Sequence, residues 1–247
     1  MSELLDLGNT RLKRARMAAD GRLHELLAWD HAAPDFAESF AAWAQSQHGP
    51  SPVALASVAP AACRETVLRI LHRAGLPVQR LRTQARLGEV RIAYAEPERL
   101  GVDRFLALLA AHARGAQPWL IVSVGSALTV DLLAADGQHQ GGLIAASPTH
   151  MRAALAERFP VLAGPTGQVL DFADDTDDAV SSGLQASAIG VIERSLRRAE
   201  ARLRQAPRLL ITGGGSESLR ADLPSDSEFA PNLVLEGMAV ALREAGR

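Results

Sequence analysis

The stretch Asp-Leu-Gly-Asn-Thr-Arg-Leu-Lys, which runs from Asp6 to Lys13, carries the first side chains whose types and spacing suggest chemistry. Gly8 permits a tight turn, and the backbone N–H groups of such a turn can face a phosphate. Asn9 and Thr10 add short donors, and Lys13 adds a positive charge. Because a carboxylate repels a phosphate, Asp6 would act by holding Mg²⁺ against the phosphate oxygens. The same residues also fit an ordinary turn without a ligand, and this stretch alone does not decide between the two.

A second candidate is Gly101-Val102-Asp103-Arg104, which directly precedes an apolar pattern with helical spacing. Asp103 could accept a proton from a substrate hydroxyl, and Arg104 could bind an anionic substrate. In the simpler interpretation, Asp103 is only the N-cap of the helix. Arg104 favours the functional interpretation, because a positive charge in the first helical turn opposes the helix dipole.

The elements that must position these residues occur twice. Residues 4–23 form an apolar run, a glycine turn, a second run and an Asp-Gly turn, which is typical of β-hairpins. Residues 118–146 repeat the layout, and Ala-Ala-Asp-Gly occurs at 18–21 and again at 134–137. A strand, three glycines and a helix follow at 209–219. The repeat predicts two related halves. The three turns predict a nucleotide bound between these two halves.

Strands and helices alternate along the remaining chain, as in α/β folds. Helices are predicted at 98–114, at about 177–205 and at about 233–245. The domain boundary is predicted between the two copies of the repeat, which gives an N-terminal domain of residues 1–115 and a C-terminal domain of residues 116–247.

The composition predicts a globular protein. The chain has 247 residues, of which 47% are hydrophobic and 22% charged, enough to bury a core without metals or disulfides. The net charge of −2 and the scattered arginines argue against a nucleic-acid ligand. Cys63 is the single cysteine, so no intramolecular disulfide forms and a cytoplasmic location is expected. No run is long enough for a membrane span, and His31 and the other histidines show no metal-ligand spacing.

Taken together, these motifs resemble the type III pantothenate kinases, a bacterial family related to the Bvg accessory factors. The resemblance implies an α/β fold of two RNase H-like domains, as in the acetate and sugar kinase/Hsc70/actin superfamily, with an interdomain nucleotide cleft. It covers nearly the whole chain and rests on the segments DLGNTRLK (6–13), YAEPERLGVDR (94–104), GSALTVD (125–131), GGLI (141–144), DDTDDAVSSG (174–183) and TGGG (212–215).

The resemblance implies ATP-dependent phosphorylation of the terminal hydroxyl of pantothenate to 4'-phosphopantothenate, the first step of coenzyme A biosynthesis. Asp103 matches the catalytic base. Thr176 matches a substrate-contacting threonine that the neighbouring subunit of a homodimer supplies. The implied ATP-binding positions are Asp6, Leu7, Gly8, Asn9, Thr10, Arg11, Leu12, Lys13, Ser126, Gly213 and Gly214. The implied pantothenate-binding positions are Tyr94, Gly101, Val102, Asp103, Arg104 and Thr176.

The chain departs from the family in the second turn. The family usually has Asp-x-Gly-Thr there, and its aspartate binds a monovalent cation, whereas this chain has Ser123-Val124-Gly125-Ser126. Because serine lacks the carboxylate charge, the sequence leaves the need for K⁺ or NH₄⁺ open, while Mg²⁺ is expected with ATP.

Two alternatives to a pantothenate kinase follow from the sequence. One is a different kinase or phosphatase of the same superfamily, which the Gly-Val-Asp-Arg segment near Tyr94 argues against. The other is a nucleotide-binding regulatory protein of the same family whose kinase activity is reduced or lost, a possibility that Ser123 motivates.

Overall fold

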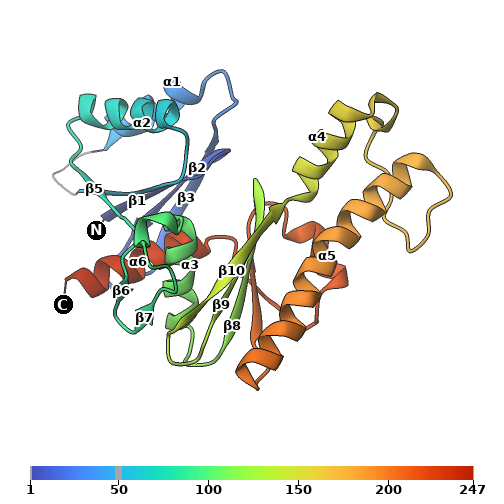
Figure 1. Ribbon diagram of the computed structural model, residues 1–247. Coiled ribbons are helices and arrows are strands. Elements are labelled where there is room, and N and C mark those ends of the chain that lie inside the picture. Colours follow the sequence, from blue (N-terminus) through green and yellow to red (C-terminus); the bar gives the residue numbers. More distant parts are fainter. Residues whose placement is uncertain (1, 48–51, 247) are drawn as a thin grey trace. The chain divides into compact units, whose positions relative to one another are not determined.

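The computed structural model describes residues 2–47 and 52–246 (Figure 1). The chain divides into two compact units. The first holds the described residues of Met1–Gly115 and Asn232–Arg247, and the second is Ala116–Pro231.

The first unit is built on a five-stranded sheet with the order β3-β2-β1-β4-β5. β2 is antiparallel to both β1 and β3, whereas β4 is parallel to β1 and β5 is parallel to β4. The strands are β1 Ser2–Leu7, β2 Arg11–Met17, β3 Leu23–Asp30, β4 Val53–Ser57 and β5 Val78–Arg80. A separate hairpin joins β6 (Arg86–Leu87) to β7 (Val90–Arg91).

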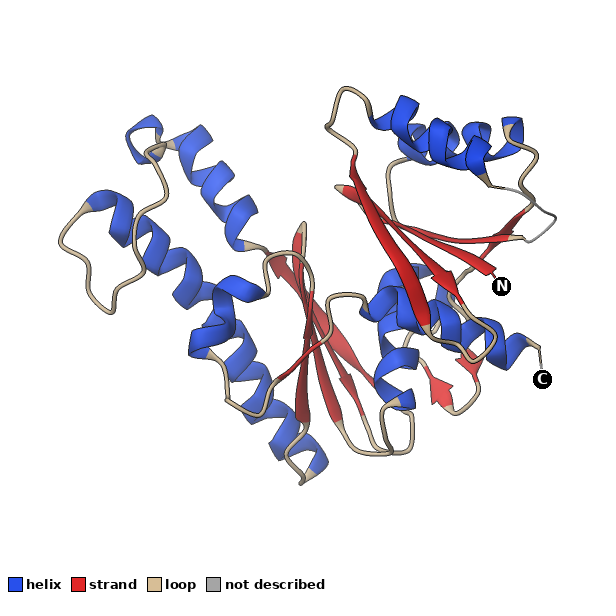
Figure 2. Ribbon diagram, turned by 180° about the vertical axis from the view of Figure 1, so that it is seen from behind, coloured by secondary structure: helices blue, strands red, loops and turns tan. Residues whose placement is uncertain are grey.

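Helices lie on both faces of this sheet (Figures 1 and 2). One face carries α1 (Phe36–Ser46) and α2 (Ala61–Arg73), and a hydrophobic cluster there includes Leu5 and Leu7 of β1. The other face carries α3 (Val102–Ala113) and α6 (Leu233–Ala245). Because successive side chains of a strand point to opposite faces, Asp6 points toward the face of α3 and α6.

The second unit repeats the sheet order as β10-β9-β8-β11-β12. Its strands are β8 Trp119–Val124, β9 Ala127–Leu133, β10 His139–Ala146, β11 Arg208–Thr212 and β12 Glu228–Phe229. β8 and β9 form the hairpin, and β11 pairs in parallel with β8, as β4 does with β1. The predicted duplication of the fold is therefore confirmed, and the nucleotide cleft between the two domains stays a prediction.

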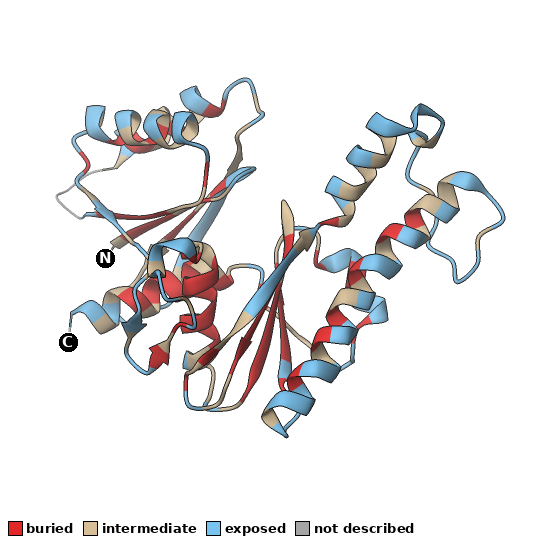
Figure 3. Ribbon diagram, in the orientation of Figure 1, coloured by how far each residue is buried: buried red, intermediate tan, exposed pale blue. Residues whose placement is uncertain are grey.

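The second unit also contains α4 (Pro148–Arg158) and α5 (Thr176–Leu203). α5 packs against the sheet through a stripe of small and aliphatic side chains, which Figure 3 shows as red patches along one side of the helix. The buried residues of α5 are Ser181, Leu184, Ala188, Ile192, Ser195 and Ala199. Their spacing of three or four residues is that of one helix face.

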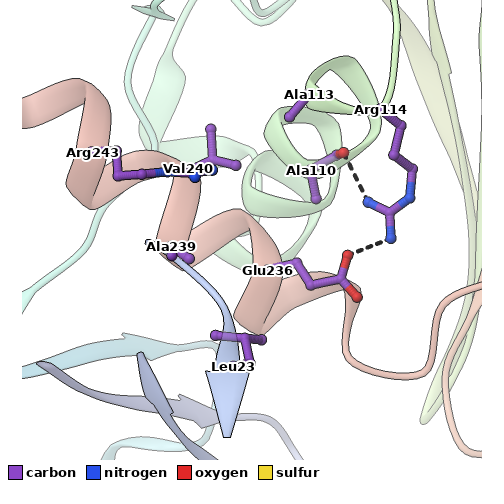
Figure 4. A pocket seen from close by; sticks show the side chains of 9 residues that line it. Leu23, Ala110, Ala113, Arg114, Glu236, Ala239, Val240 and Arg243 are labelled. Atoms are coloured by element: carbon purple, nitrogen blue, oxygen red, sulfur yellow. Dashed lines mark hydrogen bonds and ion pairs between the residues drawn. The ribbon is translucent and has the colours of Figure 1, made fainter. Parts of the chain in front are cut away.

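Helix α6 differs from the domain expectation, because it belongs to the first unit although it follows the second in sequence. It packs along α3, where Gly237 lies so close to the backbone of Leu106 that a side chain would collide with it. Arg114 joins the two helices by donating to the Ala110 carbonyl oxygen (2.9 Å) and pairing with Glu236 (Figure 4). Such packing depends on long-range contacts that the local pattern of 233–245 does not contain.

Other boundaries also differ from the sequence expectation. The helix predicted at 98–114 is interrupted, because a short 3₁₀ turn, η1 (Pro97–Arg99), ends before α3 begins at Val102. The sequence analysis did not predict α4. Two further 3₁₀ segments are η2 (Pro160–Leu162) and η3 (Glu217–Asp222).

Within the described ranges, no helix is both long enough and apolar enough to cross a membrane.

Candidate active site

The first turn, Gly8 to Arg11, joins β1 to β2 with Leu7 paired to Leu12. The Gly8 N–H donates to the Arg11 carbonyl (3.0 Å), which closes the turn and leaves Asn9 and Thr10 exposed at its tip. Leu7 and Leu12, both predicted to bind ATP, are fully buried. Their side chains therefore belong to the interior, and only their backbone borders the turn. The tip therefore presents short polar residues from a rigid two-strand base.

Asp6 and Asp103 are brought together in the first unit, although they are far apart in sequence. The pKa of Asp6 is raised to about 7, first by burial and then by the negative charge of Asp103, while the positive charge of Lys13 opposes the shift. Lys13 is the register partner of Asp6 on β2. The arrangement is therefore a carboxylate pair with a lysine beside it, at the end of β1 and the start of α3.

Asp103 is not the N-cap of α3, so the simpler interpretation of this residue is wrong. The N-cap is Gly101, and Asp103 is the second residue of the helix. One Asp103 carboxylate oxygen accepts the Arg104 N–H (2.8 Å), and a Cβ on Gly101 would lie 2.6 Å from the same oxygen. Glycine at 101 thus leaves room for the carboxylate.

Arg104 and Tyr94, both predicted to bind substrate, contact each other. Arg104 is buried and donates to the Tyr94 hydroxyl (3.2 Å), and its guanidinium lies 5.9 Å from the centre of the tyrosine ring. Val102 is buried, so its side chain belongs to the protein interior. Thr83 steadies the approach to α3 by donating to the Leu100 carbonyl (2.7 Å).

The second turn, between β8 and β9, is one residue shorter than the first, because Val124 pairs with Leu128. The Gly125 N–H donates to the Ala127 carbonyl (3.0 Å), and Ser126 stands at the tip. The hydroxyl of Ser147, the N-cap of α4, donates to the Ser126 carbonyl (3.2 Å). This hydrogen bond from Ser147 to the second turn was not predicted from the sequence. The available signal was the Ser-Pro pair, which is typical of the start of a helix.

The triple glycine packs against this second turn. Gly213 has a positive φ of 97°, and a side chain there would collide with the Val124 backbone. The Gly215 N–H donates to the Val124 carbonyl (2.9 Å). Apart from its two chain neighbours, no described residue has an atom within 4 Å of where a Cβ on Gly214 would stand, so the backbone at Gly214 is open to an approaching ligand.

Thr176, the remaining predicted substrate residue, is the exposed first residue of α5 in the second unit. The N-cap Asp175 accepts the N–H groups of Asp177 (2.9 Å) and Asp178 (3.3 Å). Ser123, the position of the family's cation-binding aspartate, is half-buried in β8, and its register partners are Thr129 and Thr212.

No group of three or more histidine, cysteine or acidic side chains within residues 2–47 and 52–246 is arranged to hold a metal ion. A hollow of about 350 Å³ in the first unit lies apart from the predicted residues (Figure 4). Its lining includes Leu23, Ala110, Arg114, Glu236 and Arg243.

Comparison with known proteins identifies the family. The family model for type III pantothenate kinase matches residues 4–198. Curated type III pantothenate kinases include one from Stenotrophomonas maltophilia strain K279a, 46% identical over 96% of this chain and 95% of the relative. Another, from Xanthomonas campestris pv. campestris strain B100, is 48% identical over 97% of this chain and 96% of the relative.

The chain belongs to the type III pantothenate kinase family. Solved structures with low sequence identity support the fold. A Campylobacter jejuni protein of the Baf family superposes with a TM-score of 0.64 at 19% identity over 99% of this chain and 98% of the other. A Sinorhizobium meliloti protein described as a 2-dehydro-3-deoxygalactonokinase gives 0.60 at 16% identity over 98% of each chain. The predicted family and fold class are confirmed.

The carboxylate pair generates a prediction for this pantothenate kinase family member. With a pKa of about 7 in the fold against an ordinary 3.8, Asp6 has no effect on stability below pH 4 and destabilises the fold increasingly up to pH 7. Asp6→Asn should therefore raise the Tm by a few degrees at pH 8 and leave it unchanged at pH 3.5. A carbon-detected NMR titration should place the Asp6 midpoint near 7 in the ligand-free protein and lower in Asp103→Asn. A wild-type midpoint near 4 would contradict the arrangement.

Gly213 and Gly214 of the triple glycine form a matched pair for a second prediction. Gly213→Ala should lower the Tm and weaken ATP binding together, because it strains a positive φ and collides with Val124. Gly214→Ala should leave the Tm within about 1 °C and still weaken ATP binding several-fold, because only a bound ligand would meet the added methyl group. Thermal unfolding measures the Tm of each variant, and calorimetric titration with ATP measures its affinity. Unchanged ATP affinity in Gly214→Ala would remove this turn from the nucleotide site.

Proposed function

We propose that this protein transfers the γ-phosphoryl group of ATP to the terminal hydroxyl of pantothenate. The observation that carries the proposal is the Asp6–Asp103 carboxylate pair on the unit that also holds Arg104 and Tyr94, within a chain of this family. The identity of 46–48% to the curated kinases extends over nearly the whole length of both chains.

The first unit supplies groups for each part of the reaction. Asp103 accepts the proton of the pantothenate hydroxyl as the oxygen attacks the γ-phosphorus. The bond from that phosphorus to the bridging oxygen breaks, and ADP leaves with the electron pair. The buried Arg104 guanidinium, with one N–H oriented by Tyr94, binds the pantothenate carboxylate. The work of the protein is thus to position the reactants and balance their charge.

A divalent cation fits the chemistry of the carboxylate pair. Two close carboxylates, one with its pKa raised to about 7, form an unfavourable pair that a cation stabilises in the ionised state. Asp6 would hold Mg²⁺, and the ion supplies charge neutralisation to the transferring phosphoryl group.

The position of Ser123 supports turnover that does not require a monovalent cation. Ser123 and its register partners Thr129 and Thr212 offer hydroxyl groups in place of a carboxylate. Neutral hydroxyls attract K⁺ or NH₄⁺ much less strongly than an aspartate does.

A homodimer is supported by the surface around Thr176. The loop before α5 exposes large apolar side chains, with Phe172 97% exposed, and a groove of about 540 Å³ runs between α4 and α5. The loop is held in place, because Ser181 and Ser182 accept the N–H groups of Gly167 and Leu170 (both 2.9 Å). An ordered apolar surface of this kind suits a protein partner, and a second copy would place its Thr176 at the neighbour's substrate.

The regulatory alternative gains no support from the comparisons, since the curated relatives carry the kinase name. Nothing in the described residues favours a different kinase or phosphatase of the superfamily over the family shown.

The central test is phosphorylation of pantothenate by the purified protein with ATP and Mg²⁺. Asp103→Asn should lower kcat by about 10²- to 10⁴-fold with little change in KM for ATP, because it removes the base of the transfer step and leaves the ATP-binding residues in place. Asp35→Asn, an exposed residue without a side-chain cap hydrogen bond, is the matched control and should be fully active. Omitting K⁺ and NH₄⁺ should leave the wild-type rate within about twofold. Near wild-type turnover by Asp103→Asn would exclude its role as the base.

Subunit mixing tests the dimer proposal. Asp103→Asn and Thr176→Ala proteins should each be nearly inactive alone. Mixed after subunit exchange, they should regain activity, because the heterodimer then contains one site with both wild-type residues. Sedimentation equilibrium gives the oligomeric state in parallel. A monomer in sedimentation, or no recovery from exchanged heterodimers, would contradict a shared site.

A further inference from the structure

His31 lies directly behind the first turn and makes no hydrogen bond through one ring nitrogen. Its backbone N–H donates to the Thr10 carbonyl (3.0 Å), which extends the β2–β3 pairing to the tip of the turn. Its ring packs against Phe36, with 5.0 Å between the ring centres. Nε2 is buried and has no hydrogen-bond partner among the described residues. A buried polar atom left unpaired costs stability, so such an atom calls for an explanation.

The other ring nitrogen decides where the proton of the imidazole lies. Nδ1 of His31 is 3.6 Å from the Cys63 sulfur on α2. Burial lowers the pKa of His31 and raises the pKa of the Cys63 thiol, so both groups are neutral at pH 7. Because a thiol sulfur accepts hydrogen bonds only weakly, we assign the thiol as the donor and Nδ1 as the acceptor, which places the single ring proton on Nε2.

The backbone of Asn9, in the candidate site, interacts with His31. The Asn9 backbone lies close enough to favour the protonated form of His31, as does the charge of Asp30. Among the described residues, Nε2 makes no well-formed hydrogen bond to Asn9 or to any other group.

We propose that His31 is a positioning residue for ATP, whose buried Nε2–H donates to the Asn9 carbonyl when phosphates occupy the turn. This inference rests on the proposed function, since it assumes that the Gly8–Arg11 turn binds ATP. A nucleotide in the turn would thus provide the buried Nε2–H with an acceptor. The imidazole thereby favours the phosphate-binding shape of the turn without touching the nucleotide.

The experiment compares His31→Phe with His31→Gln. Phenylalanine keeps the ring packing against Phe36 and removes the donor, whereas glutamine places an amide N–H near the position of Nε2. His31→Phe should weaken ATP binding and raise KM for ATP by about 5- to 10-fold, the effect of one hydrogen bond. Its kcat at saturating ATP should stay within about twofold, and its ligand-free Tm should be equal to or above that of the wild type. His31→Gln should bind ATP within about threefold of the wild type.

Trp43→Phe is the matched control. The Trp43 indole N–H is also buried without a hydrogen-bond partner among the described residues, and Trp43 packs against the hydrophobic cluster that contains Phe36. It should leave ATP affinity within about twofold. In the wild type, nitrogen NMR should show the Nε2–H tautomer of His31, and its proton should move downfield when ATP is added.

Two outcomes would overturn the inference. One is ATP affinity in His31→Phe within twofold of the wild type, and the other is a wild-type Nε2–H signal that ATP leaves unmoved. ATP binding is measured without pantothenate, so the two proposals fail separately. A wild type that binds ATP but leaves pantothenate unphosphorylated would contradict the proposed function alone. Normal phosphorylation of pantothenate by the wild type, together with unchanged ATP affinity in His31→Phe, would contradict only the role proposed for His31.

Discussion

The closeness of two carboxylates, Asp6 and Asp103, is the constraint on which the rest of the first unit depends. The raised pKa of Asp6 expresses the cost of this arrangement, which comes first from the burial of its carboxylate and then from repulsion by the charge of Asp103. The fold maintains the pair because β1 lies in the middle of its sheet and α3 is buried along most of its length (Figure 3). α6 adds support by packing along α3, and glycine at 101 leaves space for the second carboxylate. A pair that destabilises the fold is retained where its charge has a use.

The two units carry different turns on the same sheet architecture. Both sheets have the same strand order and the same central hairpin. The first hairpin carries Asp6 before a turn of four residues, and the second carries Ser123 before a turn that is one residue shorter. The second turn is supported from behind by the triple glycine and by Ser147. The first turn therefore follows a strand that carries a carboxylate near its end, whereas the second turn is packed closely against other backbone segments.

Local sequence signals predicted the parts of the fold that local interactions determine. The Asp-Gly pairs at 20–21 and 136–137 do form turns with positive φ at glycine, 84° and 80°. The repeated hairpins predicted the duplicated sheets, and the pattern at 233–245 predicted α6 with the bounds observed. The membership of α6 in the first unit was not predictable, because it depends on a glycine meeting the backbone of a helix more than a hundred residues earlier.

The candidate site was predictable only in part, for the same reason. Motif order indicated Asp6, Asp103, Arg104 and Tyr94, but the repulsion between the two carboxylates follows from tertiary contact. Asp103 was open to interpretation as an N-cap, since the residue type suits that position. His31 had no sequence signal, because its environment comes from Cys63 and Phe36 on two separate helices.

These residues are expected to transfer a phosphoryl group to an alcohol and not simply to hydrolyse ATP. Phosphorus NMR of the complete reaction, with ATP, Mg²⁺ and pantothenate, observes every product at once. We expect ADP and a new phosphomonoester in equal amounts, with almost no inorganic phosphate. ADP and inorganic phosphate formed at the same rate with or without pantothenate would contradict it.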